Sequence, residues 1–311
     1  DSTGIIFPVF LFWLYVKLKE TESAKKKCVL LFLMFFLCYI GFEIKPMAAI
    51  VMIAVAAVEG IHFIGKLLKK QIVWKKSVLA CCLSAVLGIG AAAGGVSAVV
   101  GSLHFPVVTD TVLGWQHHMM LGLNKDTNGG YSQADFDYST SFSSAEEQHA
   151  AELKEIGKRL KDFGVGGYLQ HFVKKSARNY FDGCFGWGGL GETFYTEIFP
   201  ERGTVLCSLI RSLYYDNTED TLYRYPALFR QILWYMVLVL VPFSVFTKRP
   251  LDKKRQVAVL SVLGLMLYLQ IFEAHARYLY TFVPIFVFLA TEGIDNLREY
   301  LNQKSERRVK K

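Results

Sequence analysis

The stretch CVLLFLMFFLCYIGFEIKPMAAIVMIAVAAVEGIHFI, residues 28–64, decides the fold of this chain. It contains two unbroken apolar runs, Cys28–Ile44 and Pro46–Ile64, and each is close to the roughly 17–25 residues that cross a bilayer as a helix. Neither run has the polar face of a surface helix in a soluble protein. We therefore expect two membrane-spanning helices joined by a tight turn at Glu43–Pro46.

Comparable runs recur along the chain, which has 311 residues, 52% of them hydrophobic. The sequence predicts an all-α integral membrane protein with about seven transmembrane helices and one large extracytoplasmic, mainly helical loop. The first and last runs are short, so a buried core helix or an interfacial segment is the alternative for them. The five further runs are Ile5–Val16, Ser77–Gly101, Phe229–Phe246, Gln256–Phe272 and Tyr278–Thr291.

Charge predicts which side of the membrane each segment faces. Residues 102–228 contain 11 Lys and Arg against 16 Asp and Glu, whereas the rest of the chain contains 24 against 11. Of those 24 bases, 21 lie in four segments that seven spans place on one side: 17–27, 66–76, 248–255 and 298–311. Basic short loops mark the cytoplasmic face, and their alternation with apolar spans argues against a nucleic-acid-binding patch.

The predicted organisation follows from these two patterns. We expect a multi-pass protein of the cell membrane with a cytoplasmic C-terminus. Four spans occupy residues 1–101, an extracytoplasmic loop domain occupies 102–228, three spans occupy 229–291, and 292–311 form a basic cytoplasmic tail. Because the chain begins at Asp1 rather than Met, we also expect it to be the C-terminal portion of a longer protein.

The long loop has the mixed, aromatic-rich composition of a folded segment. Ser144 with Glu147 three residues later resembles a capping box, which opens a helix at about Ala145–Phe163 before Gly164. A second, amphipathic helix at about Tyr168–Phe181 is expected either to lie on the outer headgroups or to pack against the transmembrane bundle. Two cysteines, Cys184 and Cys207, are candidates for a disulfide if the loop is outside the cell.

The strongest candidate site is the segment QIFEAHARYLY, residues 270–280, where Glu273, His275 and Arg277 lie between two apolar runs. Ionisable groups at membrane depth are costly and usually functional. Arg277 has the planar fork that binds phosphate in a bidentate manner, and Glu273 would orient it if the helix continues. A short hairpin turn with solvated charges is the alternative. A second candidate cation, Lys45, either binds an anionic headgroup or reaches to the interface as a membrane-end lysine does.

A third candidate is the segment from Asp110 to His118, which includes Trp115 and His117. Adjacent histidines point to different faces, whereas metal sites favour spaced ligands, so substrate contact or packing is preferred over a metal site. No cofactor is predicted, although a divalent metal stays possible. The fourth is Glu59 with His62, interpreted as a helix-packing polar pair. Motifs of serine hydrolases, zinc peptidases and dinucleotide-binding enzymes are absent.

These residues resemble a known family. Lys45-Pro46 after an apolar span, a large external loop and Glu273-Ala-His-Ala-Arg277-Tyr278 opening a final span resemble the C-terminal part of bacterial polytopic glycosyltransferases of the C-type superfamily. That superfamily includes enzymes similar to protein O-mannosyltransferases and enzymes that transfer sugars to lipid A. Further similarity to Gram-positive members lies in the loop segments Trp115–Gly122, Asn128–Tyr131 and Asp182–Gly191.

The resemblance implies transfer of a sugar from a polyprenyl-phosphate carrier to an envelope glycan, lipid or protein at the outer membrane surface. It implies that Arg277 and Lys45 hold the carrier phosphate. The catalytic base would be an acidic residue of a first external loop, on chain that precedes this one. Implied supporting residues are Glu273, His275, Tyr278 and Glu43, and implied sugar or acceptor contacts are Asp110, Trp115, His117 and His118.

Two other classes of protein fit the same sequence. A polymerase or ligase of lipid-linked polysaccharide also has a large external loop and outer-face arginines. A non-enzymatic transporter or membrane subunit is the other alternative, but a transporter needs polar residues along several spans near the membrane midplane. The spans of this chain are mostly apolar, with polar residues gathered at one end, which favours chemistry at the membrane surface.

Overall fold

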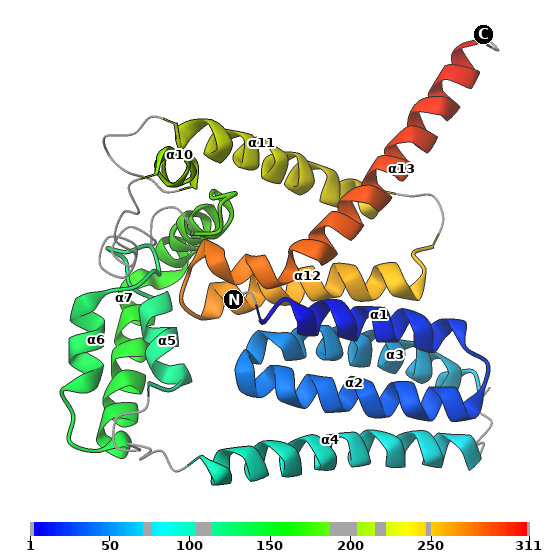
Figure 1. Cartoon of the computed structure of the whole chain (residues 1–311), viewed down its shortest axis with the longest axis horizontal. Helices are drawn as coiled ribbons and strands as arrows, with labels where there is room; N and C mark the ends of the chain where they lie inside the picture. Colours follow the sequence, from blue (N-terminus) through cyan, green and yellow to red (C-terminus); the bar gives the residue numbers. More distant parts are fainter. Residues whose placement is uncertain are drawn as a thin grey trace. The chain divides into compact units, whose positions relative to one another are not determined.

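A computed structural model describes residues 3–70, 76–103, 113–186, 204–214, 222–246 and 250–309. The described residues form helices and turns without a strand (Figure 1). They group into two compact units. Unit 1 comprises Asp1–Val107, Phe243–Tyr268 and Thr281–Lys311, and unit 2 comprises Val108–Pro242 and Leu269–Tyr280.

The N-terminal part of unit 1 consists of apolar helices joined by tight turns. The turn after the second helix closes because the Lys45 backbone N–H donates to the Gly41 oxygen at 2.7 Å, and Pro46 follows at the start of a short 3-10 helix, where a missing N–H costs nothing. Gly41 also allows close packing, since a Cβ there would lie 2.8 Å from the ring of Phe7. The helices are α1 (Ile6–Glu20), α2 (Ala24–Ile44), η1 (Pro46–Ala48), α3 (Ala49–Leu68) and α4 (Lys76–Ser102).

The remaining helices of unit 1 come from the C-terminal third of the chain. Asp252 caps the helix that begins at Lys253, because its Oδ1 accepts the Arg255 backbone N–H at 2.9 Å. The buried apolar core of the unit draws on helices from both ends of the sequence, with Leu11, Val51, Val257, Leu265 and Leu289 among its members. Unit 1 contains α13 (Val283–Val309) and most of α12 (Lys253–Ile271), whose last three residues belong to unit 2. The short helices η2 (Val241–Ser244) and η3 (Ala276–Phe282) are each divided between the two units.

The prediction of an all-α membrane protein is confirmed. Six helical segments of the described chain are long and apolar enough to cross a bilayer: Ala24–Ile44, Pro46–Leu68, Val78–Ser102, Arg224–Ser244, Lys253–Ile271 and Ala276–Ser305. The first predicted span, Ile5–Val16, forms the 15-residue helix α1. At 1.5 Å per residue that helix is shorter than the roughly 30 Å hydrocarbon core of a bilayer. The described structure therefore supports six span-length helices rather than seven.

The polar end of unit 1 is held by a carboxylate in α3. Glu59 accepts hydrogen bonds from the Tyr15 hydroxyl and the Lys253 ammonium, each at 2.7 Å, and pairs with Lys19 at 2.6 Å. Two of the basic segments thus meet at one end of the unit, in agreement with the charge pattern. His62 is not the partner of Glu59: its Nδ1 lies 2.8 Å from the Val58 oxygen of its own helix. Lysines from α1 and α12 reach the carboxylate instead, and charge-assisted bonds are stronger than a neutral contact.

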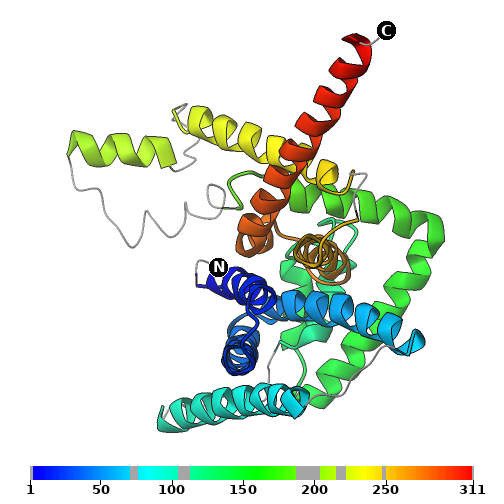
Figure 2. The ribbon, with the colours of Figure 1, turned by 90° about the vertical axis from the view of Figure 1, so that its right-hand side faces the viewer.

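Unit 2 is built from shorter helices around the long helix α7. The predicted cap is present, since the Ser144 Oγ accepts the Glu147 backbone N–H at 3.3 Å. The expected break at Gly164 is also present, where φ is 56° and α7 bends (Figure 2). This backbone conformation suits glycine because it has no Cβ. The helices of unit 2 are α5 (Trp115–Gly122), α6 (Gln133–Thr140), α7 (Ala145–Tyr180), α10 (Val205–Tyr214) and α11 (Arg224–Leu240).

Candidate functional site

The candidate site of unit 2 is built on the segment that follows α12. The helix ends at Ile271, and residues 273–275 are not helical. There the Ala274 backbone N–H donates to the Gly129 oxygen at 2.6 Å, so the segment is tied to the turn after α5. The expectation that a continuing helix would let Glu273 orient Arg277 is therefore wrong, because the bond to Gly129 replaces the next helical turn.

Glu273 is a buried carboxylate with two side-chain partners. Its Oε2 accepts the Tyr278 hydroxyl at 2.9 Å and lies 3.5 Å from Nδ1 of His118. Burial raises the pKa of Glu273, but the contacts with His118 and Tyr278 and the charge of Arg277 outweigh it, so the pKa lies below its ordinary value. Glu273 is therefore a fixed negative charge at physiological pH.

His275 and Arg277 are joined through the backbone. The Arg277 N–H donates to Nδ1 of His275 at 3.2 Å, which requires an imidazole without a proton on that nitrogen. Burial, followed by the charge of Arg277, lowers the pKa of His275, in agreement with a neutral ring. The Arg277 guanidinium carbon lies 5.4 Å from the ring centroid of Tyr278.

The charge of the Arg277 guanidinium is not matched by a bound carboxylate. Within the part of the chain that the structure describes, its guanidinium has no carboxylate within the 4.0 Å of an ion pair. The charges of Glu273 and Arg277 interact, while the Glu273 oxygen Oε2 accepts the Tyr278 hydroxyl. A second guanidinium lies beside the same segment, because Nε of Arg178 donates to the Ala274 oxygen at 3.4 Å.

The two adjacent histidines diverge, as expected of neighbours on a helix. His118 joins the site through Glu273, whereas His117 is buried and its Nδ1 lies 2.7 Å from the Ser139 hydroxyl. Burial, followed by the neighbouring His118, lowers the pKa of His117. His117 is therefore a neutral residue that packs in the interior. No group of three or more His, Cys, Asp or Glu side chains suited to a metal occurs among the described residues.

The other sequence candidates have separate locations. Trp115 begins α5 and is exposed. Glu43 lies in the last turn of α2 and Lys45 lies between α2 and η1, both in unit 1. The part of Lys45 in phosphate binding and the supporting part of Glu43 stay predictions. Asp110 lies outside the described residues. Cys184 and Cys207 are both free thiols, so the suggested disulfide is not formed.

Lys175 is a residue of this region that sequence reasoning missed. It is fully buried, and its ammonium donates to the backbone oxygens of Gly122 and Gln270, each at 2.9 Å. Nε2 of His171 lies 2.9 Å from the same Gly122 oxygen. Burial lowers the pKa of Lys175 to about 7, although Glu273 opposes this shift. The four-residue spacing of His171, Lys175 and Asn179 is the signal in the sequence that indicates one polar helix face.

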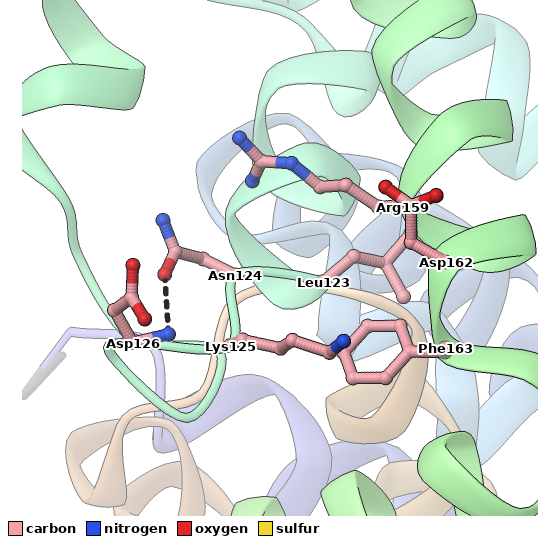
Figure 3. A pocket seen from close by; sticks show the side chains of 7 residues that line it. All are labelled: Leu123, Asn124, Lys125, Asp126, Arg159, Asp162 and Phe163. Atoms are coloured by element: carbon pink, nitrogen blue, oxygen red, sulfur yellow. Dashed lines mark hydrogen bonds between the residues drawn. The ribbon is translucent and has the colours of Figure 1, made fainter.

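A second polar cluster joins α6 to α7. Arg159 binds Asp135 in a bidentate manner, with nitrogen–oxygen distances of 2.9 and 2.7 Å, and also donates to the Met120 oxygen at 2.9 Å. Beside it is a cavity of about 190 Å³ lined by Leu123, Asn124, Lys125, Asp126, Arg159, Asp162 and Phe163 (Figure 3). Two basic and two acidic side chains balance each other there, so its charge does not single out one class of ligand.

The span-length apolar helices define a polytopic integral membrane protein. The chain belongs to the family of conserved hypothetical integral membrane proteins, whose family model matches residues 5–296. Comparison with curated proteins found no match, and neither did comparison with solved structures.

Proposed function

We propose that this chain is part of a membrane glycosyltransferase and holds the phosphate of a polyprenyl-phosphate-linked sugar during transfer to an envelope acceptor. The observation that carries the proposal is the half-buried Arg277, which has no carboxylate partner in the described structure. An arginine fork in this state is suited to bind a phosphate through two parallel hydrogen bonds.

The groups around Arg277 favour reversible binding of an anion. Glu273 is kept in place by His118 and Tyr278, so it does not fold onto the guanidinium. Arg178 supplies a second cation beside Ala274, which offsets the charge of Glu273. A phosphate that gains charge as the sugar leaves is stabilised by such prearranged donors, and this is commonly a large catalytic contribution.

The place of Arg277 along the chain also supports a lipid-linked donor. Arg277 follows the end of span-length helix α12 by six residues and lies in the first turn of the final span-length segment, Ala276–Ser305. Cations at the ends of spans lie at the depth of lipid headgroups. The charge pattern assigns this end of the spans to the extracytoplasmic side of the cell membrane, with the C-terminus in the cytoplasm. The general base is assigned to chain outside this cluster, as the family resemblance implies.

The test is binding of a polyprenyl phosphate, compared with the corresponding polyprenol, to the protein in nanodiscs. We expect the phosphate to bind more tightly to the wild type, and Arg277→Ala to remove this preference with a loss of roughly 10- to 100-fold, since hydrogen bonds to charged groups contribute about 1.5–3 kcal/mol. Arg277→Lys keeps the charge but loses the fork and should give an intermediate affinity.

The matched control is Arg224→Ala, which removes an exposed arginine of unit 2 at the start of α11. This variant should bind the polyprenyl phosphate as the wild type does. If Arg277→Ala binds the phosphate normally, Arg277 does not hold it. If the wild type binds polyprenol and polyprenyl phosphate equally well, the phosphate site itself is refuted. Transfer of a radiolabelled sugar from the polyprenyl phosphate by the full-length protein then tests the reaction.

A further inference from the structure

The C-terminal segment of α7, residues 165–180, buries its polar face and exposes its apolar face. His171, Lys175 and Asn179 lie on the inner face and are at most 4% exposed. The apolar side chains Val165, Leu169 and Val173 are 83%, 61% and 65% exposed. In a protein surrounded by water the apolar stripe faces the core, so the environment of this segment is not simply water.

The inner face of the segment is bonded to the end of span-length helix α12. Lys175 donates to the Gln270 oxygen at 2.9 Å, and the Gln270 side-chain amide donates to the Ser176 hydroxyl at 2.8 Å. Gln270 is the penultimate residue of α12. The segment therefore lies beside the terminus of this helix.

The C-terminal end of the same segment is bonded to span-length helix α11. Nε1 of Trp234 donates to the Tyr180 oxygen at 3.0 Å, and the Tyr235 hydroxyl donates to the Phe181 oxygen at 3.3 Å. The Gly183 backbone N–H donates to the Gln231 side chain at 2.8 Å. Trp and Tyr side chains with one polar atom are typical of the boundary between lipid and water.

The two helices locate the segment relative to the bilayer. The end of α12 lies at one membrane face when this helix crosses the bilayer. Lys175 bonds to this end, whereas Tyr180 and Phe181 bond to Trp234 and Tyr235, which lie midway along the span that contains α11. The segment thus lies between the end of one span and the middle of another, at the depth just inside the headgroups, with its apolar side chains outward.

We infer that residues 165–180 form an interfacial helix whose exposed face lies in the boundary between headgroups and acyl chains. Val165, Leu169, Phe172 and Val173 form this face. Lipid is the partner that fits this face, because the two helices that hold the segment are themselves span-length and apolar. The exposed Lys174 extends its ammonium toward lipid phosphates while its methylene chain covers apolar surface. This inference does not depend on the proposed sugar transfer.

The experiment uses nitroxide labels on the protein in phospholipid vesicles containing anionic lipid. In a variant without the native cysteines, Val173→Cys is labelled, and Lys158→Cys on the first segment of α7 is the control. We expect the label at 173 to be reached by lipid-soluble oxygen several-fold more than by a water-soluble nickel complex, and the label at 158 to show the reverse preference. Equal access of the nickel complex to both labels overturns the inference.

A second measurement keeps the native cysteines, because their removal can impair folding. A photo-crosslinking p-benzoylphenylalanine at position 173 is irradiated in the same vesicles, and the products are identified by mass. A lipid adduct supports the interfacial helix. An adduct with a second copy of the chain or with another protein, or the absence of a lipid adduct in protein that retains its wild-type helical content, overturns it.

Discussion

The ammonium nitrogen of Lys175 lies 2.9 Å from the backbone oxygen of Gln270, a residue 95 positions later in the chain. Its other bond is to the Gly122 oxygen, and no described carboxylate lies within ion-pair distance of it. A neutral amine keeps two N–H donors and satisfies both carbonyls equally well. A positive charge on this buried nitrogen therefore lowers the stability of the folded protein. Deprotonation removes this penalty without breaking either hydrogen bond.

Stability should rise with pH because of Lys175. Its pKa is about 7 in the folded protein and near 10.5 when unfolded, so the unfolded chain binds more protons between these two values. In this window the free energy of unfolding should increase by up to about 1.4 kcal/mol per pH unit. The increase is absent below pH 7, where both states are protonated. Thermal unfolding in detergent from pH 6 to pH 10 measures it.

The control for this prediction is the neighbouring exposed lysine. Lys175→Met should remove the pH-dependent rise, whereas Lys174→Met should retain it, since Lys174 is exposed. If both variants keep the slope, its source is another group.

Asp135 should be important for the stability of unit 2. It is buried and bonded to both terminal nitrogens of Arg159 and to the Asn124 amide. Asp135→Ala leaves the guanidinium without its main counter-charge and should lower the free energy of unfolding by roughly 3 kcal/mol. Asp137→Ala, two residues along the same helix at an exposed position, should change it by less than about 0.5 kcal/mol. Chemical denaturation of both variants makes the comparison, and equal losses would show that the bidentate pair is not the cause.

Gly88 should be required for the packing of α2 against α4. A Cβ at this position would contact the Phe32 backbone oxygen at less than van der Waals distance, whereas a Cβ at Gly90 has nothing within 4 Å. Gly88→Leu should force the helices apart and cost about 1–3 kcal/mol, and Gly90→Leu should be nearly neutral. Melting temperatures of the two variants in the same detergent test this, and a destabilised Gly90→Leu with a normal Gly88→Leu would contradict the packing.

Cys28 and Cys81 should form a disulfide on mild oxidation. Their sulfurs lie 3.9 Å apart between α2 and α4, so a small movement brings them to bonding distance. Copper phenanthroline should produce a linked peptide pair that contains both residues, detectable by mass spectrometry. Cys81→Ser should abolish this product, and Cys82→Ser, at an exposed neighbouring position, should not. A product that links Cys28 to Cys82 instead would require a rotated α4.

Local features of the fold were predictable because each depends on residues that are close in sequence. The length of the apolar run Cys28–Ile44 indicates a span directly, and the Ser144 cap and the Gly164 break follow from side-chain and backbone chemistry within a few positions. The first run, Ile5–Val16, was too short for such an inference, and it forms a helix below span length.

The candidate site was predictable only in part. Glu273, His275 and Arg277 were recognisable because ionisable residues between two apolar runs are unusual. The contact of Glu273 with His118 joins residues 155 positions apart, and no pattern in the sequence indicates that these two residues meet. Likewise, the lysines that bind Glu59 come from two other helices, whereas spacing along α3 suggested His62.

The sequence by itself determined that the chain is helical and that it inserts in a membrane, and it singled out Glu273, His275 and Arg277 as candidates for a site. These properties follow from hydrophobic length and from the cost of charge at membrane depth, both of which are local. Only the tertiary structure decided that Lys175 is buried and that Leu169 and Val173 face outward. A helical pattern defines two faces, but the partners that cover one of them, here Gly122 and Gln270, come from distant segments, and lipid permits an apolar face to remain on the outside.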